Sequence, residues 1–128
     1  MKSLLLVMAG GALGAGMRFL LGSGLDRITA PSAWPWGTFS ANVSGGFAMG
    51  LLVAWLMASP RGMDQDLRLL LGVGLLGGFT TFSAFSLEMA MMLERGAAVS
   101  AMAYAAASVI IALLALFGGL AAGRAMFA

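Results

Sequence analysis

The stretch GGFTTFSAFS, residues 77–86, is where chemistry is most expected in this chain. It lies in an uncharged run from Leu69 to Leu87 that is centred on Gly78. Glycine and β-branched threonine are poor helix formers, so a helix break near Gly77 and Gly78 is one interpretation. A broken helix frees carbonyls that can bind a cation and amides that favour an anion. The other interpretation is an unbroken helix, with glycines for packing and hydroxyls bonded to their own carbonyls.

Phe82 and Phe85 follow in the same stretch and share one helix face, because they are three residues apart. Core packing or lipid contact is the plain interpretation of such a pair. The functional interpretation uses the electropositive edge of each ring, which can meet an anion.

Asn42 and Arg18 are polar groups inside otherwise apolar segments. An amide or a cation in lipid is costly unless it has a partner. Asn42 could join two helices or donate N–H groups to an anion. Arg18 could reach the membrane interface, pair with a carboxylate such as Glu88, or attract an anion, and its spacing does not decide between these.

Ser100, Tyr104 and Ser108 repeat every four residues on an alanine-rich segment. Serines in membrane helices often bond back to a carbonyl of their own helix, which would make this stripe structural. With a tyrosine in line, a polar track that an anion could follow is the alternative.

The composition requires a membrane environment for the elements that carry these groups. The chain has 128 residues, of which 61% are hydrophobic and 9% charged, and its mean hydropathy is +0.99. Soluble domains carry about 25% charged residues, so this chain cannot cover a water-facing surface. It has no cysteine and no histidine, which removes disulfides, thiol catalysis, histidine bases and the usual zinc and haem sites. We therefore expect an integral membrane protein that is not an enzyme.

Nucleic-acid and nucleotide binding are also disfavoured. The basic residues are scattered and form no patch. Gly72, Gly74 and Gly77 match the pattern G-x-G-x-x-G, but no strand precedes them and so no dinucleotide-binding unit is expected.

Four apolar spans divide the chain, and each has the roughly 20 residues that a membrane-crossing helix needs. Nothing alternates at the period of a strand, so we predict an all-α protein with one four-helix domain over residues 1–128. The predicted spans are residues 3–25, 37–58, 67–93 and 97–123.

The charges at the span ends favour neither orientation strongly. Four spans put both termini and the second connection on one side of the membrane, with Lys2, Arg61, Arg68 and Arg124. Arg27 and Arg95 lie on the other side. So small a bias is what a chain that inserts in both orientations would show.

Four short helices also leave little room for a pore, so transport by this chain would require self-association. Small residues four apart, such as Gly10 and Gly14 or Gly46 and Gly50, let helices approach closely. Such pairs serve packing within one chain or a contact between two copies.

Three segments of the chain resemble the Fluc (CrcB) family of small fluoride channels: GGALGAGMRF, WPWGTFSANVSGG and GGFTTFSAFSLE. The resemblance covers all four spans. It implies an antiparallel, dual-topology homodimer in the cell inner membrane, with two pores and a third helix broken near the bilayer midplane. The implied function is passive export of cytoplasmic fluoride, which gives fluoride resistance.

The resemblance also assigns roles to particular residues. The backbone carbonyls of Gly77 and Thr80 would bind a structural sodium ion at the dimer interface. Arg18 matches an arginine near a pore entrance. The other residues assigned to the fluoride path are Asn42, Thr81, Phe82, Phe85, Tyr104 and Ser108.

Two positions depart from the family pattern. Ala84 and Ala112 stand where the family often has hydroxyl residues, so the polar track is expected to be shorter. The competing hypotheses are a dual-topology multidrug carrier and a membrane subunit without transport of its own. The carrier would need a carboxylate in the middle of the first span, where Arg18 is the charge instead.

Overall fold

A computed structural model describes residues 1–60 and 64–128 of the chain. Arg61, which was counted among the charges above, lies outside these residues. Three long helices are continuous, and the third span is divided into four pieces. The continuous helices are α1 (Lys2–Thr29), α2 (Trp36–Ala58) and α6 (Ala98–Phe127). The pieces of the third span are α3 (Gln65–Leu67), the π-helix η1 (Arg68–Leu76), α4 (Gly77–Phe79) and α5 (Ser83–Glu94).

Within the described ranges, four segments are long and apolar enough to cross a membrane, which confirms the expected all-α class. They are α1, α2, α6 and the combined third segment, Gln65–Glu94. The predicted spans fall inside these segments, except that residue 97 precedes α6. Most large apolar side chains on the outer faces are exposed, as expected where lipid replaces water as the solvent.

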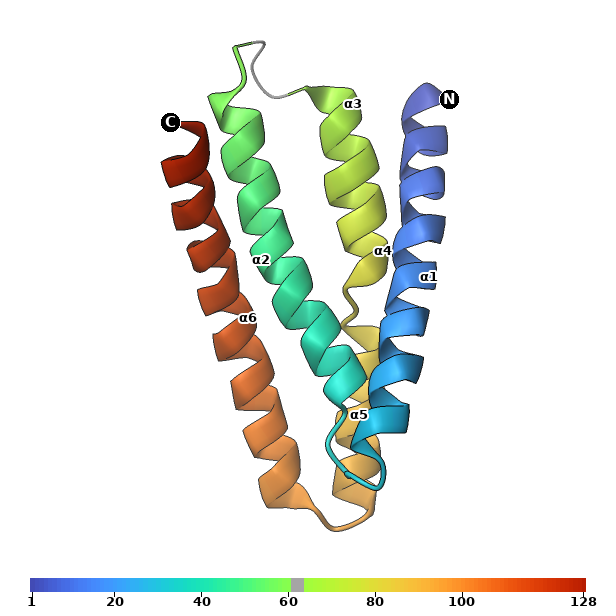
Figure 1. Ribbon diagram of the computed structural model, residues 1–128. Coiled ribbons are helices and arrows are strands. Elements are labelled where there is room, and N and C mark those ends of the chain that lie inside the picture. Colours follow the sequence, from blue (N-terminus) through green and yellow to red (C-terminus); the bar gives the residue numbers. More distant parts are fainter. Residues whose placement is uncertain (61–63) are drawn as a thin grey trace.

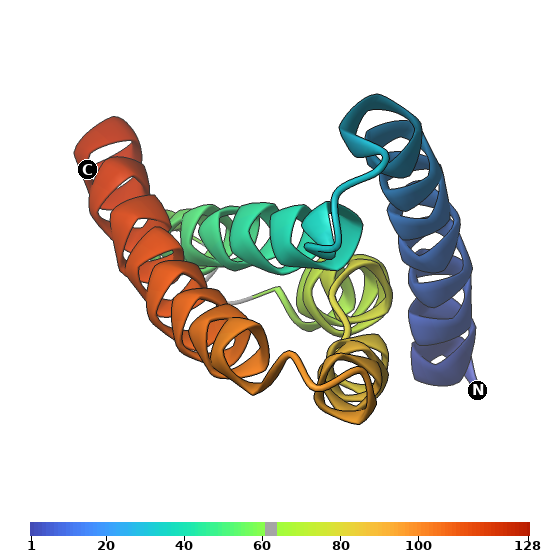
Figure 2. The ribbon, with the colours of Figure 1, turned by 90° about the horizontal axis from the view of Figure 1, so that it is seen from below.

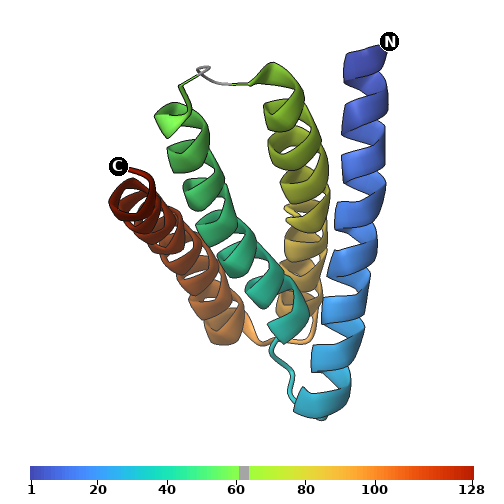
Figure 3. The same ribbon diagram turned by 45° about the horizontal axis from the view of Figure 1, so that its top comes forward.

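Both termini lie at one end of the molecule, together with the end of α2 and the start of α3 (Figure 1). The α1–α2 and α5–α6 connections lie at the opposite end. Seen from below, α1 and α6 lie at opposite sides, with α2 and the third segment between them (Figure 2). Turning the molecule shows the same order (Figure 3). The third segment, which carries the GGFTTFSAFS stretch, is therefore central.

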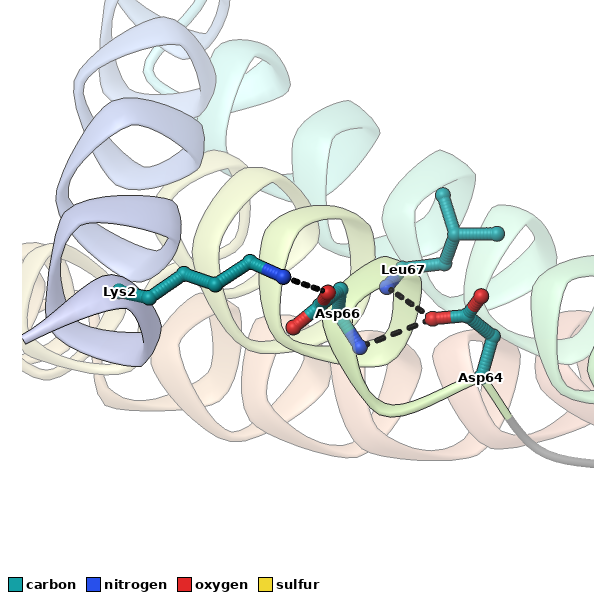
Figure 4. A network of polar contacts seen from close by, with 4 residues as sticks. All are labelled: Lys2, Asp64, Asp66 and Leu67. Carbon is teal, nitrogen blue, oxygen red and sulfur yellow. Dashed lines mark hydrogen bonds and ion pairs between the residues drawn. The ribbon is translucent and has the colours of Figure 1, made fainter.

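Polar contacts fix the start of the third segment. Asp64 caps α3 by accepting hydrogen bonds from the amides of Asp66 and Leu67, at 3.0 and 3.1 Å. The ammonium of Lys2 pairs with the Asp66 carboxylate and so links the N-terminus of α1 to this point (Figure 4). The cap satisfies amides that would otherwise lack a helical partner.

Glycines bring the helices together within the single chain. A methyl group on Gly14 would lie 2.0 Å from the Leu75 carbonyl oxygen, so α1 meets the third segment backbone to backbone. A methyl group on Gly50 would lie 2.2 Å from the Leu116 carbonyl oxygen, which brings α2 equally close to α6. These small-residue faces therefore serve packing within the chain.

The third helix is interrupted, but not at the glycines where the break was expected. Gly77 and Gly78 are helical, and the extended backbone begins at Thr80, whose ψ is 161°. The physical reason is packing: a methyl group on Gly78 would lie 2.5 Å from the Gly11 carbonyl oxygen. Gly78 is needed for contact with α1, whereas a methyl group on Gly77 would meet only the Gly72 carbonyl oxygen, at 3.7 Å. The interruption falls at residues 80–82, between α4 and α5.

Candidate functional site

An open groove of about 460 Å³ runs between α2, the interruption of the third helix and α6. Seven of the nine residues to which the family resemblance assigns a role line this groove. They are Asn42, Gly77, Thr80, Thr81, Phe82, Phe85 and Ser108. Residues from three segments that are distant in sequence therefore meet at one place, as a binding site requires. Tyr104 and Arg18 do not line this groove.

Asn42 replaces the helical hydrogen bonds that the interruption removes. Its Oδ1 accepts a bond of 2.8 Å from the Thr81 amide, and its Nδ2 donates a bond of 2.9 Å to the Thr81 carbonyl. This pairing fixes the orientation of the amide group. The carboxamide has a second N–H on Nδ2, and Asn42 lines the groove. It can therefore hold the backbone and still donate to a bound anion.

Backbone carbonyls at the interruption lose their helical donors. In a continuous helix the Gly77 carbonyl would accept from the Thr81 amide, which here donates to Asn42 instead. Between the described residues, neither the Gly77 nor the Thr80 carbonyl accepts a backbone or side-chain hydrogen bond. Because both residues line the groove, these oxygens are available as ligands for a cation.

The Thr80 hydroxyl has a partner in its own helix. It donates to the Leu76 carbonyl at 3.0 Å. Within residues 1–60 and 64–128, no three acidic, histidine or cysteine side chains come together. A cation at this place would therefore depend on carbonyl oxygens.

Phe82 and Phe85 form a tilted pair whose ring centroids are 5.5 Å apart. Phe82 is 76% exposed, whereas Phe85 is 7% exposed. The Phe85 ring packs on the Tyr104 ring, with 5.2 Å between the ring centroids. This exposure shows that Phe82 is not part of the core, which leaves contact with lipid, with a second chain or with an ion. The Phe85 ring is thus fixed by the core, whereas Phe82 lines the groove and is largely exposed.

Ser108 lines the groove from α6, and its hydroxyl oxygen is buried there. The residue is 5% exposed, and its Oγ has no hydrogen-bond partner among the described residues. It therefore does not bond back to its own helix, the plainer of the two interpretations. Ala112 also lines the groove, one turn further along α6, and adds no donor.

Tyr104 lies beside the groove in a cluster of polar groups. Its hydroxyl donates to Glu88 Oε2 at 2.8 Å, and the Thr38 hydroxyl donates to Glu88 Oε1 at 2.6 Å. Trp34 packs edge-on against the Tyr104 ring at 5.4 Å. The sequence analysis did not single out Thr38, and it considered Glu88 only as a possible partner of Arg18. The signal available was that Glu88 is an acid directly after the uncharged run.

Arg18 lies on the other side of the interruption. Its Nε donates to the Gly78 carbonyl at 3.2 Å. The pairing with Glu88 considered above is not formed, since that carboxylate accepts from Thr38 and Tyr104.

The sequence model of the CrcB family, described as "CrcB-like protein, Camphor Resistance (CrcB)", matches residues 5–120. This chain belongs to the CrcB family. Relatives named "Fluoride-specific ion channel FluC" align over all or nearly all of its length. The relative from Caulobacter vibrioides is 52% identical and that from Phenylobacterium zucineum is 55% identical, each over all 128 residues of both chains. The relative from Mesorhizobium japonicum is 50% identical over 126 residues, covering 98% of this chain and 99% of its own.

Membership in the CrcB family agrees with the architecture. Four apolar helices and ion-channel relatives of equal length together identify a multi-pass membrane protein. Among the described residues, polar groups gather inside the apolar segments at the groove and beside it, where Thr38 and Tyr104 bond Glu88.

Replacing Asn42 tests how the interruption is held. Asn42→Leu keeps the size of the side chain but removes both bonds to Thr81. A buried backbone group without a partner costs about 1–3 kcal/mol, so we expect the Thr81 amide to exchange with deuterium about ten- to a hundredfold faster. The measurement is amide hydrogen exchange on the purified protein. Ser44→Ala is the control, because that hydroxyl bonds carbonyls of its own helix. Unchanged exchange at Thr81 would contradict the assignment.

Proposed function

We propose that this CrcB chain is a fluoride-specific ion channel through which cytoplasmic fluoride leaves the cell down its electrochemical gradient. One observation carries the proposal: the groove gathers neutral donors and aromatic edges in a chain whose full-length relatives are named fluoride-specific channels. No step requires ATP or a second transported ion. Export of this kind would make the cell resistant to fluoride.

The path begins with replacement of the hydration shell of fluoride. The second N–H of Asn42, the unpaired hydroxyl of Ser108 and the edges of Phe82 and Phe85 would take the place of water. Thr81 also lines the groove. Its hydroxyl accepts from the Ala84 amide at 3.2 Å and lies 3.4 Å from Ser83 Oγ, so its proton would turn from Ser83 to meet an anion.

Tyr104 would extend the path beyond Phe85. It lies one helical turn before Ser108 and packs on the Phe85 ring. Its hydroxyl donates to Glu88 and would have to turn to meet an anion. The Ser108 hydroxyl could therefore meet an anion without breaking a hydrogen bond, whereas the Tyr104 hydroxyl would first have to leave Glu88.

A second copy of the chain would complete the pore. The groove is open, and Phe82 projects from it with 76% of its surface exposed. Lipid against the polar groups of the groove would leave them unsatisfied. Since the charges at the two ends are nearly balanced, we propose an antiparallel homodimer in the cell inner membrane, with the grooves of both copies forming two paths.

A sodium ion fits the interruption. The carbonyls of Gly77 and Thr80 would bind it, two from each copy, on the two-fold axis of the dimer. Bound there, it would supply fixed positive charge that raises the potential felt by nearby anions. The support is that both carbonyls lie at the groove without helical donors.

Fluoride release from liposomes tests the channel. Purified protein should release fluoride rapidly and release no chloride under the same gradient. Phe82→Ile should slow release at least tenfold, because an aliphatic side chain has no electropositive edge. Phe117→Ile, an exposed phenylalanine outside the groove, is the matched control and should behave as the wild type. If a well-folded dimer releases no fluoride, the proposed function is refuted. If the wild type, Phe82→Ile and Phe117→Ile all release fluoride at the same rate, the proposed path along Phe82 is refuted.

Bound sodium tests the cation site. Atomic emission should find about one sodium ion for two chains in protein purified without added sodium, as ligation by four carbonyls in a dimer implies. Thr80→Ser should retain both the ion and fluoride release, because the ligand is the main-chain carbonyl. Loss of the ion in Thr80→Ser would contradict ligation by the backbone.

Labelling of the termini tests the dual topology. The chain has no cysteine, so a single cysteine at Ala128 is a unique label site. In sealed vesicles of native membrane, an impermeant maleimide should reach about half of the chains before the vesicles are opened and all of them afterwards. Labelling of all chains, or of none, before opening would exclude insertion in both orientations.

A further inference from the structure

We propose that Arg18 is a positioning residue of the channel, which acts through its Nε–H bond to the Gly78 carbonyl and not as a charge that attracts anions. The bond holds α4 against α1. The carbonyls of Gly77 and Thr80, which Arg18 does not bond, belong to residues that line the groove. This inference rests on the proposed channel function, because the path is built on the interruption that Arg18 supports.

The Gly78 carbonyl needs a donor because the helix ends just beyond it. In a continuous helix it would accept from the Phe82 amide, four residues on. The extended backbone at Thr80 removes that partner. Arg18 Nε takes its place at 3.2 Å, from a different helix and 60 residues away in sequence. The Arg18 bond and the two Asn42 bonds thus replace backbone hydrogen bonds that a continuous helix would make here.

The packing of α1 places Arg18 at this carbonyl. Gly11, Gly14 and Arg18 are three and four residues apart and so follow one face of α1. Gly11 meets Gly78, and Gly14 meets Leu75, both backbone to backbone. The guanidinium reaches the interruption from the side of α1, whereas the groove lies on the side of α2 and α6. This geometry favours a structural bond over direct contact with a passing anion.

Three substitutions separate the bond from the charge. The nitrogen Nε2 of glutamine is the same number of bonds from Cα as Nε of arginine. Arg18→Gln therefore keeps a donor in place and removes the charge. Arg18→Lys keeps the charge but has a methylene at this position, with its nitrogen one bond further. Arg18→Met has neither a donor nor a charge.

The experiment is fluoride release from liposomes by the full-length protein and these three variants. We expect Arg18→Met to slow release at least tenfold, Arg18→Gln to slow it by no more than about threefold, and Arg18→Lys to fall between them. Arg27→Gln is the matched control, since Arg27 is an exposed arginine in the last turn of the same helix. It should release fluoride at the wild-type rate.

Amide hydrogen exchange on the same variants gives a second readout that does not require transport. The amides of residues 79–83 should exchange at least tenfold faster in Arg18→Met and less than threefold faster in Arg18→Gln. Exchange in the middle of α2 and α6 should be unchanged in both, whereas general loss of structure would raise it throughout.

The outcomes separate the hypotheses. Wild-type release by Arg18→Lys, with Arg18→Gln and Arg18→Met equally slow, would show that charge matters and would overturn the proposal. Wild-type release by Arg18→Met would overturn it as well. If the wild type itself releases no fluoride, the proposed function fails, and the exchange pattern at residues 79–83 still decides whether Arg18 holds the interruption.

Discussion

Hydrogen bonding of the backbone in lipid is the constraint on which this structure depends. A membrane-spanning helix must satisfy its carbonyls and amides internally, because lipid offers no partner. The third segment violates this rule at residues 80–82. Asn42 and Arg18 compensate from two other helices, by bonding Thr81 and Gly78. The carbonyls that they leave unbonded, at Gly77 and Thr80, are the ones that lie at the groove.

The helix packing follows from the same constraint. Side chains can reach the interrupted backbone only if α1 and α2 approach it closely, and glycines at the contacts allow that approach. A helix with larger residues at Gly14 or Gly78 would keep Arg18 away from the carbonyl that it bonds. Gly78, which looked like a helix breaker in the sequence, thus serves the interruption indirectly, by letting α1 bring Arg18 into hydrogen-bonding range.

The sequence predicted the features that depend on local composition. Hydropathy is enough to place four spans. The mixture of glycine and threonine made an interrupted third helix one of two interpretations, and the family resemblance implied the interruption. The position of the interruption was predicted about three residues too early, because glycine propensity alone does not reveal that Gly78 packs on Gly11. The partners of Arg18 and Glu88 could not be predicted. They lie 60, 50 and 16 residues away in the chain, so they depend on how the helices pack.

The neutral lining of the groove explains how it could select an anion and still release it. Among the described residues that line it, none is charged. Arg18 is bonded behind the interruption, and the Glu88 carboxylate accepts the hydroxyls of Thr38 and Tyr104. Fluoride would therefore meet neutral donors, such as the Ser108 hydroxyl and the second N–H of Asn42. A guanidinium or ammonium group in direct contact with fluoride would bind the ion tightly and slow its departure, whereas neutral groups compensate for lost water and still release it.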